Sequence, residues 1–158
     1  MARIYRAFFE DVSISVAQDM LQLKGASGKM LRLLGVGCYC TNTTLATSQS
    51  IKTRTRVLPA TVTDGSGGST PTVQKTDIGD AAASATALAN NTTKATSSGT
   101  VVVVDEGGAH LYNGYEKRWT RDNAPKIGPS QAAVLELMSK VIGTVNMSGW
   151  MEFEEEGG

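Results

Sequence analysis

The aromatic residues of this chain fall into two blocks near its ends, and this distribution constrains the fold more than any other feature. Between Cys40 and Leu111 there is no aromatic residue, and the segment is rich in Thr, Ser, Ala and Gly. Aromatic side chains contribute strongly to core burial, so the core must be built chiefly from the two ends. Because the ends are far apart in sequence, long-range contacts must hold the fold, as in a closed sandwich or barrel. The nine aromatics are Tyr5, Phe8, Phe9 and Tyr39, then Tyr112, Tyr115, Trp119, Trp150 and Phe153.

Alternation with a period of two predicts β-strands in several segments. From 51 to 58 the alternation places Lys52, Arg54 and Arg56 on a face exposed to water. Residues 12–16 alternate in the same way. Near the C-terminus, the face expected to enter the core carries Val145, Met147, Met151 and Phe153. Trp150 falls on the opposite face, where it either covers a cross-strand neighbour or contacts another subunit.

One segment changes its period. The apolar residues of 31–40 occupy odd positions up to Leu33 and even positions from Leu34 onward. A β-bulge near Leu33–Leu34 would keep both sets facing inward, because one extra residue reverses the alternation. Gly35 and Gly37 would then lie on the opposite face, where another group could approach closely.

Helix signals are weaker than strand signals. Residues 130–142 fit a helix and a strand almost equally, and we favour the strand because the surrounding elements are β. Residues 18–23 share this ambiguity. The alanines of 81–89 favour a helical turn. The run Val101–Val104 is typical of a short strand buried on both faces.

These patterns predict a single all-β antiparallel sandwich over residues 1–158, with a long Ser/Thr/Gly/Ala-rich central insertion at 60–99. Loops of this length without structure are uncommon in compact domains. The insertion is too poor in large apolar groups to fold alone. It is therefore either a mobile surface loop or an arm ordered by a neighbouring subunit.

Composition excludes several classes of protein. The 15 Lys+Arg balance the 15 Asp+Glu, which argues against a nucleic-acid binder and against a charge-extended disordered chain. No apolar run approaches the roughly 18 residues of a membrane span. The 2 cysteines are too few for a disulfide scaffold. Zero net charge also favours association.

Motifs that could carry chemistry are incomplete. Cys38 and Cys40 lack the further ligands of a zinc site and are expected to be small hydrophobes. His110 is the single histidine, and no nucleophile elbow accompanies it. The glycine-rich segment 64–69 lacks both a calcium-loop and a phosphate-loop pattern, and the acidic run 152–156 is typical of a solvated tail. We therefore predict no catalytic, cofactor or metal residues and no enzyme.

An aromatic and basic cluster follows the histidine. Such residues either stack on a sugar or base or anchor a protein partner. The cluster consists of Tyr112, Tyr115 and Trp119 with Lys117, Arg118 and Arg121. The alternative is a hairpin that packs its own aromatics. The three aromatics and Arg121, together with Trp150, are the candidates for an interface or ligand contact.

Several segments together resemble small structural proteins of tailed bacteriophages. They are Val16–Leu23, Ala26–Leu33, Asp64–Pro71, Ile78–Thr86, Ala89–Thr93 and Met147–Glu155. The resemblance implies a jelly-roll head-decoration (capsid cement) protein without catalytic residues. It further implies a homotrimer that bridges major capsid subunits on the outer head surface, is made in the host bacterial cytoplasm, and contacts neither nucleic acid nor membrane directly.

A second hypothesis belongs to a different class. The chain could be a carbohydrate- or receptor-binding module of a phage tail or fibre that uses Tyr112, Tyr115 and Trp119.

Overall fold

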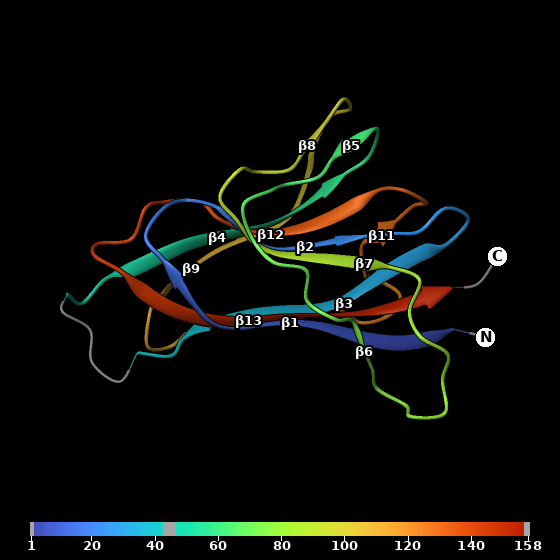
Figure 1. Ribbon diagram of the computed structural model, residues 1–158, viewed down its shortest axis with the longest axis horizontal. Helices are drawn as coiled ribbons and strands as arrows, with labels where there is room; N and C mark the ends of the chain where they lie inside the picture. The colour runs from blue at the N-terminus through green and yellow to red at the C-terminus, as the bar shows by residue number, and fades with distance from the viewer. Residues whose placement is uncertain (1, 43–46, 157–158) are drawn as a thin grey trace.

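Four nested antiparallel strand pairs organise the molecule (Figure 1). The computed structural model describes residues 2–42 and 47–156. The eight strands that form these pairs are β1 (Arg3–Ile14), β2 (Asp19–Lys24), β3 (Met30–Cys40), β4 (Ser50–Leu58), β9 (Val102–His110), β10 (Tyr115–Arg118), β12 (Ala132–Leu137) and β13 (Val145–Glu156). β1 pairs with β13, β2 with β12, β3 with β10 and β4 with β9.

This folded ribbon wraps into two facing sheets. β13 also pairs with β3, and β12 also pairs with β4. Sheet A therefore has the order β10-β3-β13-β1-β6, and sheet B has the order β7-β2-β12-β4-β9. The additional short strands are β5 (Val62–Thr63), β6 (Gln74–Lys75), β7 (Thr86–Asn91), β8 (Thr96–Ser97) and β11 (Lys126–Ile127). Nested pairing around two antiparallel sheets is the jelly-roll arrangement, so the predicted all-β sandwich is confirmed.

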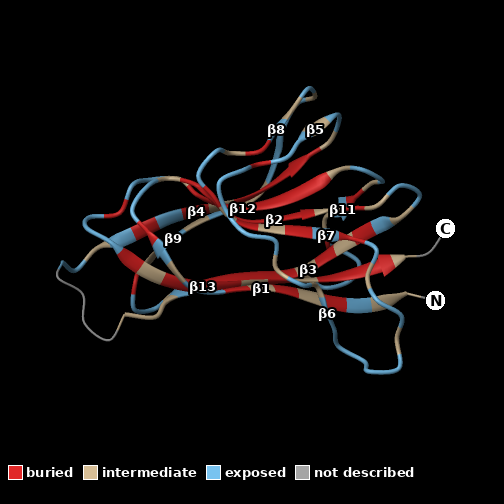
Figure 2. Ribbon diagram, viewed as in Figure 1, coloured by how far each residue is buried: buried red, intermediate tan, exposed pale blue. Residues whose placement is uncertain are grey.

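The core lies between the two sheets, where buried residues line both inner faces (Figure 2). β1 and β13 supply its aromatic centre, in which the rings of Tyr5 and Phe153 lie 5.7 Å apart. The inward face predicted for the C-terminal strand is buried throughout, at Val145, Met147, Met151 and Phe153. Both chain ends thus meet in sheet A, as their aromatic content indicated.

The β-bulge predicted at Leu33–Leu34 is present. Phe153 pairs with Leu33 while Glu152 pairs with Gly35, so Leu34 is the extra residue. Leu33 before the bulge and Val36 after it are both fully buried. Without the bulge, one half of β3 would turn its apolar residues to water.

Residues 132–137 form a strand, as favoured above, and 19–24 do likewise. The helical turn expected at 81–89 is wrong: Thr86–Asn91 is strand β7, which pairs with β2 and follows an irregular stretch. Across the described residues there is no helix, and hence none that could cross a membrane.

The Val101–Val104 prediction is wrong in its burial. The run enters β9, an outer strand of sheet B that pairs with β4 alone. Val101, Val102 and Val103 are exposed, and Val104 packs against the core. Period alone does not distinguish a doubly covered strand from an edge strand, because both tolerate β-branched residues.

The 60–99 segment contains four short strands and packs against its own chain. β7 extends sheet B, and β6 pairs with Tyr5 and Arg6 of β1 in sheet A. β5 and β8 pair with each other in a projection at the top of Figure 1. The segment thus joins the edges of both sheets although it carries few large side chains.

A buried network of charges anchors this segment on the outer face of sheet B. Arg56, expected in water, is buried, and its guanidinium lies 2.9 Å from Asp19 and 3.2 Å from Glu136. The Ala95 N–H donates to Asp19 at 2.6 Å, and the Lys94 ammonium lies 2.6 Å from Glu136. The segment carrying these two residues covers the Arg56 side chain, a long-range contact that β4 alone does not reveal.

The two carboxyl groups of this network respond differently to it. Burial raises the pKa of Asp19 above its usual value despite the Ala95 N–H and Arg56. Burial also opposes ionisation of Glu136, but hydrogen bonds from Arg54 and Lys94 outweigh that effect and hold its pKa below the usual value. The surrounding cations therefore stabilise the ionised form of Glu136 more strongly than that of Asp19.

We expect Arg56→Leu to lower the free energy of unfolding by about 3–5 kcal/mol, because two buried carboxylates lose their shared cation. Lys52→Leu is the matched control on the same strand. Its exposed pair with Glu106 is worth about 0–1 kcal/mol. Urea denaturation followed by circular dichroism measures both, and equal losses for the two variants would contradict the assignment.

Cys38 is buried in the core, as expected of a small hydrophobe, and burial raises the pKa of its thiol to about 12. We expect Ellman's reagent at pH 8 to modify at most one thiol of the folded protein and two after unfolding in urea. In Cys40→Ser, no thiol should react until the chain unfolds. Rapid reaction of the folded Cys40→Ser variant would show that Cys38 is accessible.

Candidate functional site

The outer face of sheet A brings together the most distinctive side chains of the molecule. On β13, Trp150 and Glu152 point outward between β1 and β3. Phe8 is the cross-strand neighbour of Trp150, and Arg6 is the neighbour of Glu152. On the other side of β13, β3 presents two glycines to this face, which leaves room for large side chains.

The indole of Trp150 lies flat over those glycines. A Cβ placed on Gly37 would come within 2.7 Å of the indole Nε1, and one placed on Gly35 within 3.0 Å of the six-membered ring. The close approach predicted for the glycine face is therefore made by Trp150 from the neighbouring strand. The bulge at Leu34 puts the glycines on this face, so the same irregularity serves both the core and the site.

Two guanidinium groups flank the indole. The Arg118 guanidinium carbon lies 4.5 Å from the ring centroid, and that of Arg6 lies 5.9 Å away. Both arginines also pair with Glu152, Arg118 at 3.1 Å. Arg118 further donates to Glu116 at 2.7 Å, and this hydrogen bond raises the pKa of Arg118. We call Trp150, Arg6, Arg118 and Glu152 the indole–arginine cluster.

The acidic run near the C-terminus is not the solvated tail that its composition suggested. It forms the end of β13, and Glu154 and Glu155 are both buried. Glu154 pairs with Arg121 at 2.9 Å and with Arg32 at 3.4 Å. Glu155 accepts hydrogen bonds from the backbone N–H groups of 84 and 85 and so fixes the start of β7.

The residues predicted to contact a partner or ligand do not form one continuous surface. The phenolic O–H of Tyr115 donates a hydrogen bond to the Asp105 carboxylate. Burial and this hydrogen bond together raise the pKa of Tyr115 well above its usual value. Trp119 is half-buried against the core. Tyr112 is exposed and stacks on His110 at 5.5 Å. Arg121 is exposed and pairs with Glu154, two residues along β13 from Glu152, but it makes no contact with Trp150 that the described structure shows. The indole–arginine cluster therefore contains Trp150, together with Arg118 from the aromatic and basic segment.

Other motifs from the sequence also acquire definite roles. His110 Nε2 lies 2.7 Å from the Ser48 hydroxyl, while its Nδ1 faces the Tyr112 N–H rather than a carboxylate. A serine-hydrolase triad requires that carboxylate to orient the ring. Asp64, from the glycine-rich segment, pairs with Lys24 and accepts from Gln22. Within the described ranges, no group of three or more His, Cys, Asp or Glu side chains is arranged to hold a metal ion.

Comparison with known proteins returns no relative. No family model matches the chain, no curated protein matches it, and no solved structure matches it.

We expect Gly37→Ala to displace the indole of Trp150, because the new methyl group would overlap Nε1. Overpacking of this kind costs about 1–3 kcal/mol. In a Trp119→Phe background, the displaced Trp150 should show a red-shifted emission maximum. Gly79→Ala, whose Cβ meets nothing closer than 3.4 Å, is the control and should leave the spectrum unchanged. An unshifted spectrum for Gly37→Ala would contradict the packing.

Proposed function

We propose that this chain is a structural virion protein that decorates the head shell of a tailed bacteriophage. It assembles as a homotrimer and bridges major capsid subunits, with the outer face of sheet A as the surface that contacts the capsid. The resemblance of its segments to phage structural proteins supplies the class of function. The observation that carries the choice of surface is the indole–arginine cluster.

The chemistry of the cluster suits a protein partner. Tryptophan and arginine are the residues most enriched at binding hot spots, and here they are held in place before any partner arrives. Glycines form the floor under the ring, and Glu152 fixes both guanidinium groups. Little side-chain entropy is therefore lost on binding, which favours affinity.

The charge pattern around the cluster also favours binding to a polar protein surface. Arg6, Glu152, Arg118 and Glu116 form one continuous chain of ion pairs across the sheet. A balanced surface of this kind forms directional contacts without attracting nucleic acid. A decoration protein binds the assembled lattice and stabilises it by mass action.

We expect Trp150→Ala and Arg118→Ala each to weaken binding to undecorated capsids of the cognate phage by at least about tenfold, since a hot-spot truncation costs about 2 kcal/mol or more. Lys52→Ala, on the outer face of sheet B, is the control and should bind like the wild type. Co-sedimentation with capsids measures the dissociation constant. Failure of the wild-type chain to bind capsids would overturn the proposed function, and unchanged binding by both cluster variants would overturn the assignment of the surface.

The carbohydrate-binding alternative makes a separate prediction. Glycan-array binding that is lost in Trp119→Ala would favour it over capsid decoration. Tyr112 is the exposed member of its proposed residues, while Tyr115 and Trp119 are partly covered.

A further inference from the structure

An apolar side chain projects from the turn after β6. Ile78 is 94 % exposed, the highest value among the large hydrophobic residues that the structure describes. The turn belongs to the loop at the lower right of Figure 1, well away from the core. A singly exposed apolar side chain is ordinary on a protein surface, so the exposure of Ile78 indicates a contact only together with the turn that presents it.

The turn that carries Ile78 is held by several contacts. The Asp77 carboxylate accepts from the Gly79 N–H at 2.9 Å, and the Asp80 N–H donates to the Asp77 carbonyl at 3.1 Å. The Lys75 ammonium donates to the Ile78 and Asp80 carbonyls at 3.1 and 2.9 Å. Arg3 pairs with the Asp80 carboxylate at 3.2 Å, which ties the turn to β1. Ile78 is therefore presented outward with little conformational freedom to lose.

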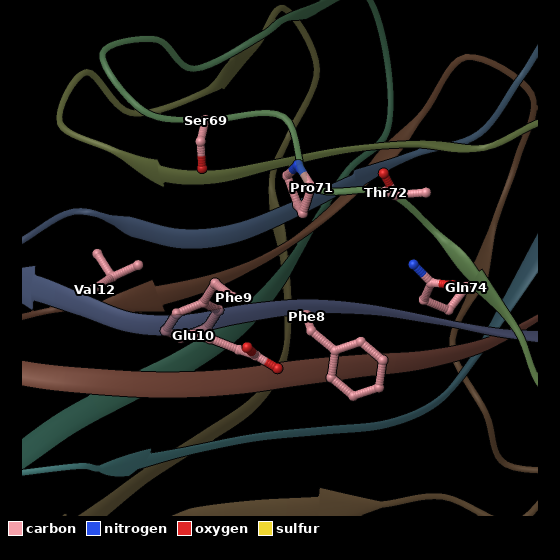
Figure 3. Close-up of a pocket in the computed structure, with 8 residues that line it drawn as sticks. All are labelled: Phe8, Phe9, Glu10, Val12, Ser69, Pro71, Thr72 and Gln74. Carbon is pink, nitrogen blue, oxygen red and sulfur yellow. The ribbon is translucent and has the colours of Figure 1, made fainter.

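A groove of about 560 Å³ opens on the same edge of the sandwich (Figure 3). Phe8, Phe9, Glu10 and Val12 line it from β1. Ser69, Pro71, Thr72 and Gln74 line it from the facing segment. Four of these eight side chains are apolar, and Glu10 is the single charged one.

The groove exists because the chain leaves β1 at this point. β6 pairs with Tyr5 and Arg6, whereas Ser69 pairs with Ala89 at the edge of the opposite sheet. Between these two attachments the segment crosses from one sheet to the other. In the described chain, β1 from Ala7 onward is paired on its β13 side alone, so this side of the groove is an open strand edge. Open edges of this kind favour association with another chain.

We propose that Ile78 of one copy inserts into this groove on a second copy of the chain. The groove offers Phe8, Phe9 and Pro71 to the isoleucine side chain. Ile78 does not fill the groove of its own copy, because it is 94 % exposed and is absent from the groove lining. A second copy brings the same turn to the groove from outside.

Charge supports this choice of occupant. Among the described residues, Glu10 at the groove has no ion-pair partner, and Lys75 beside Ile78 has no carboxylate partner. Insertion of the turn brings the Lys75 ammonium, which bonds only to backbone carbonyls within the turn, toward the Glu10 carboxylate. Asp80 is already paired with Arg3, and the Asp77 carboxylate accepts from the Gly79 N–H but has no cationic partner among the described residues.

The protruding residue and the groove are different surfaces of one chain. The contact is therefore either reciprocal between two copies or repeated head to tail around a ring. This contact deepens the proposed function. It rests on the proposed self-association of the chain and not on the proposed binding to capsids.

Sedimentation velocity over a range of protein concentrations tests the contact. We expect Ile78→Asp to weaken self-association of the full chain at least tenfold. Ile142→Asp is the matched control, because Ile142 is also exposed (62 %) but lies on a different loop, and it should associate like the wild type. Thr72→Trp, which fills the groove from its rim, should weaken association as Ile78→Asp does. Thermal unfolding establishes that each variant is folded.

A cross-link gives an independent readout. In a Cys40→Ser background, chains carrying Ile78→Cys mixed with chains carrying Thr72→Cys should form a mixed disulfide in preference to either homodimer. A dissociation constant on the order of 100 µM corresponds to a weak interface. A wild-type chain that stays monomeric at about this concentration would overturn both the contact and the proposed trimer. Association of Ile78→Asp equal to wild type, or no excess of mixed disulfide, would overturn the contact alone. Capsid binding by Ile78→Asp monomers would leave the decoration function standing.

Discussion

Pairing of β1 with β13 is the interaction on which the rest of the structure depends. It joins the two ends of the chain in the centre of sheet A and brings Tyr5 against Phe153. Each inner pair of the nested ribbon then closes within the loop that the outer pair defines. Tyr5 and Phe153 lie in these end strands, and the middle of the chain contributes smaller apolar side chains to the core, such as Ile51 and Ala87. Nearly all stabilising contacts are consequently long-range, and we expect folding to be slow for a chain of this size.

The same pairing creates the outer surface that we propose for binding. β13 lies between β1 and β3, so Trp150 can be flanked by an arginine from each side of the sheet. The bulge in β3 determines which face its glycines occupy, and thereby whether an indole fits beside them. A local irregularity of one residue thus connects core packing to surface chemistry. Neither the indole nor its arginines would be held without both neighbouring strands.

The insertion between β4 and β9 shows how a segment poor in apolar residues is ordered. Several of its attachments are polar: Ala95 and Lys94 bond to buried carboxylates, and Glu155 accepts hydrogen bonds at the start of β7. Desolvation offsets much of the attraction within buried charges of this kind, so they add little net stability, although removal of one partner is costly. Small apolar side chains, among them Ala87 and Ala89, also pack into the core. The insertion also forms one wall of the groove beside β1 and carries Ile78. The insertion therefore extends the edges of both sheets and adds small side chains to the core.

From sequence alone, period-two patterning and the aromatic blocks determined the fold class, the inward faces of β4 and β13, and the bulge at Leu34. These features are readable because strand periodicity and burial act on neighbouring residues. Tertiary structure decided the burial of Arg56 under Ala95, the exposure of Val102, and the meeting of Trp150 with Arg6 and Arg118. Each of these depends on which distant segment lies beside a strand, and the period of a strand is the same whether its neighbour is a sheet, a loop or water. For that reason the sequence indicated Trp150 and Arg118 separately, but it could not show that they meet, and it did not indicate Arg6.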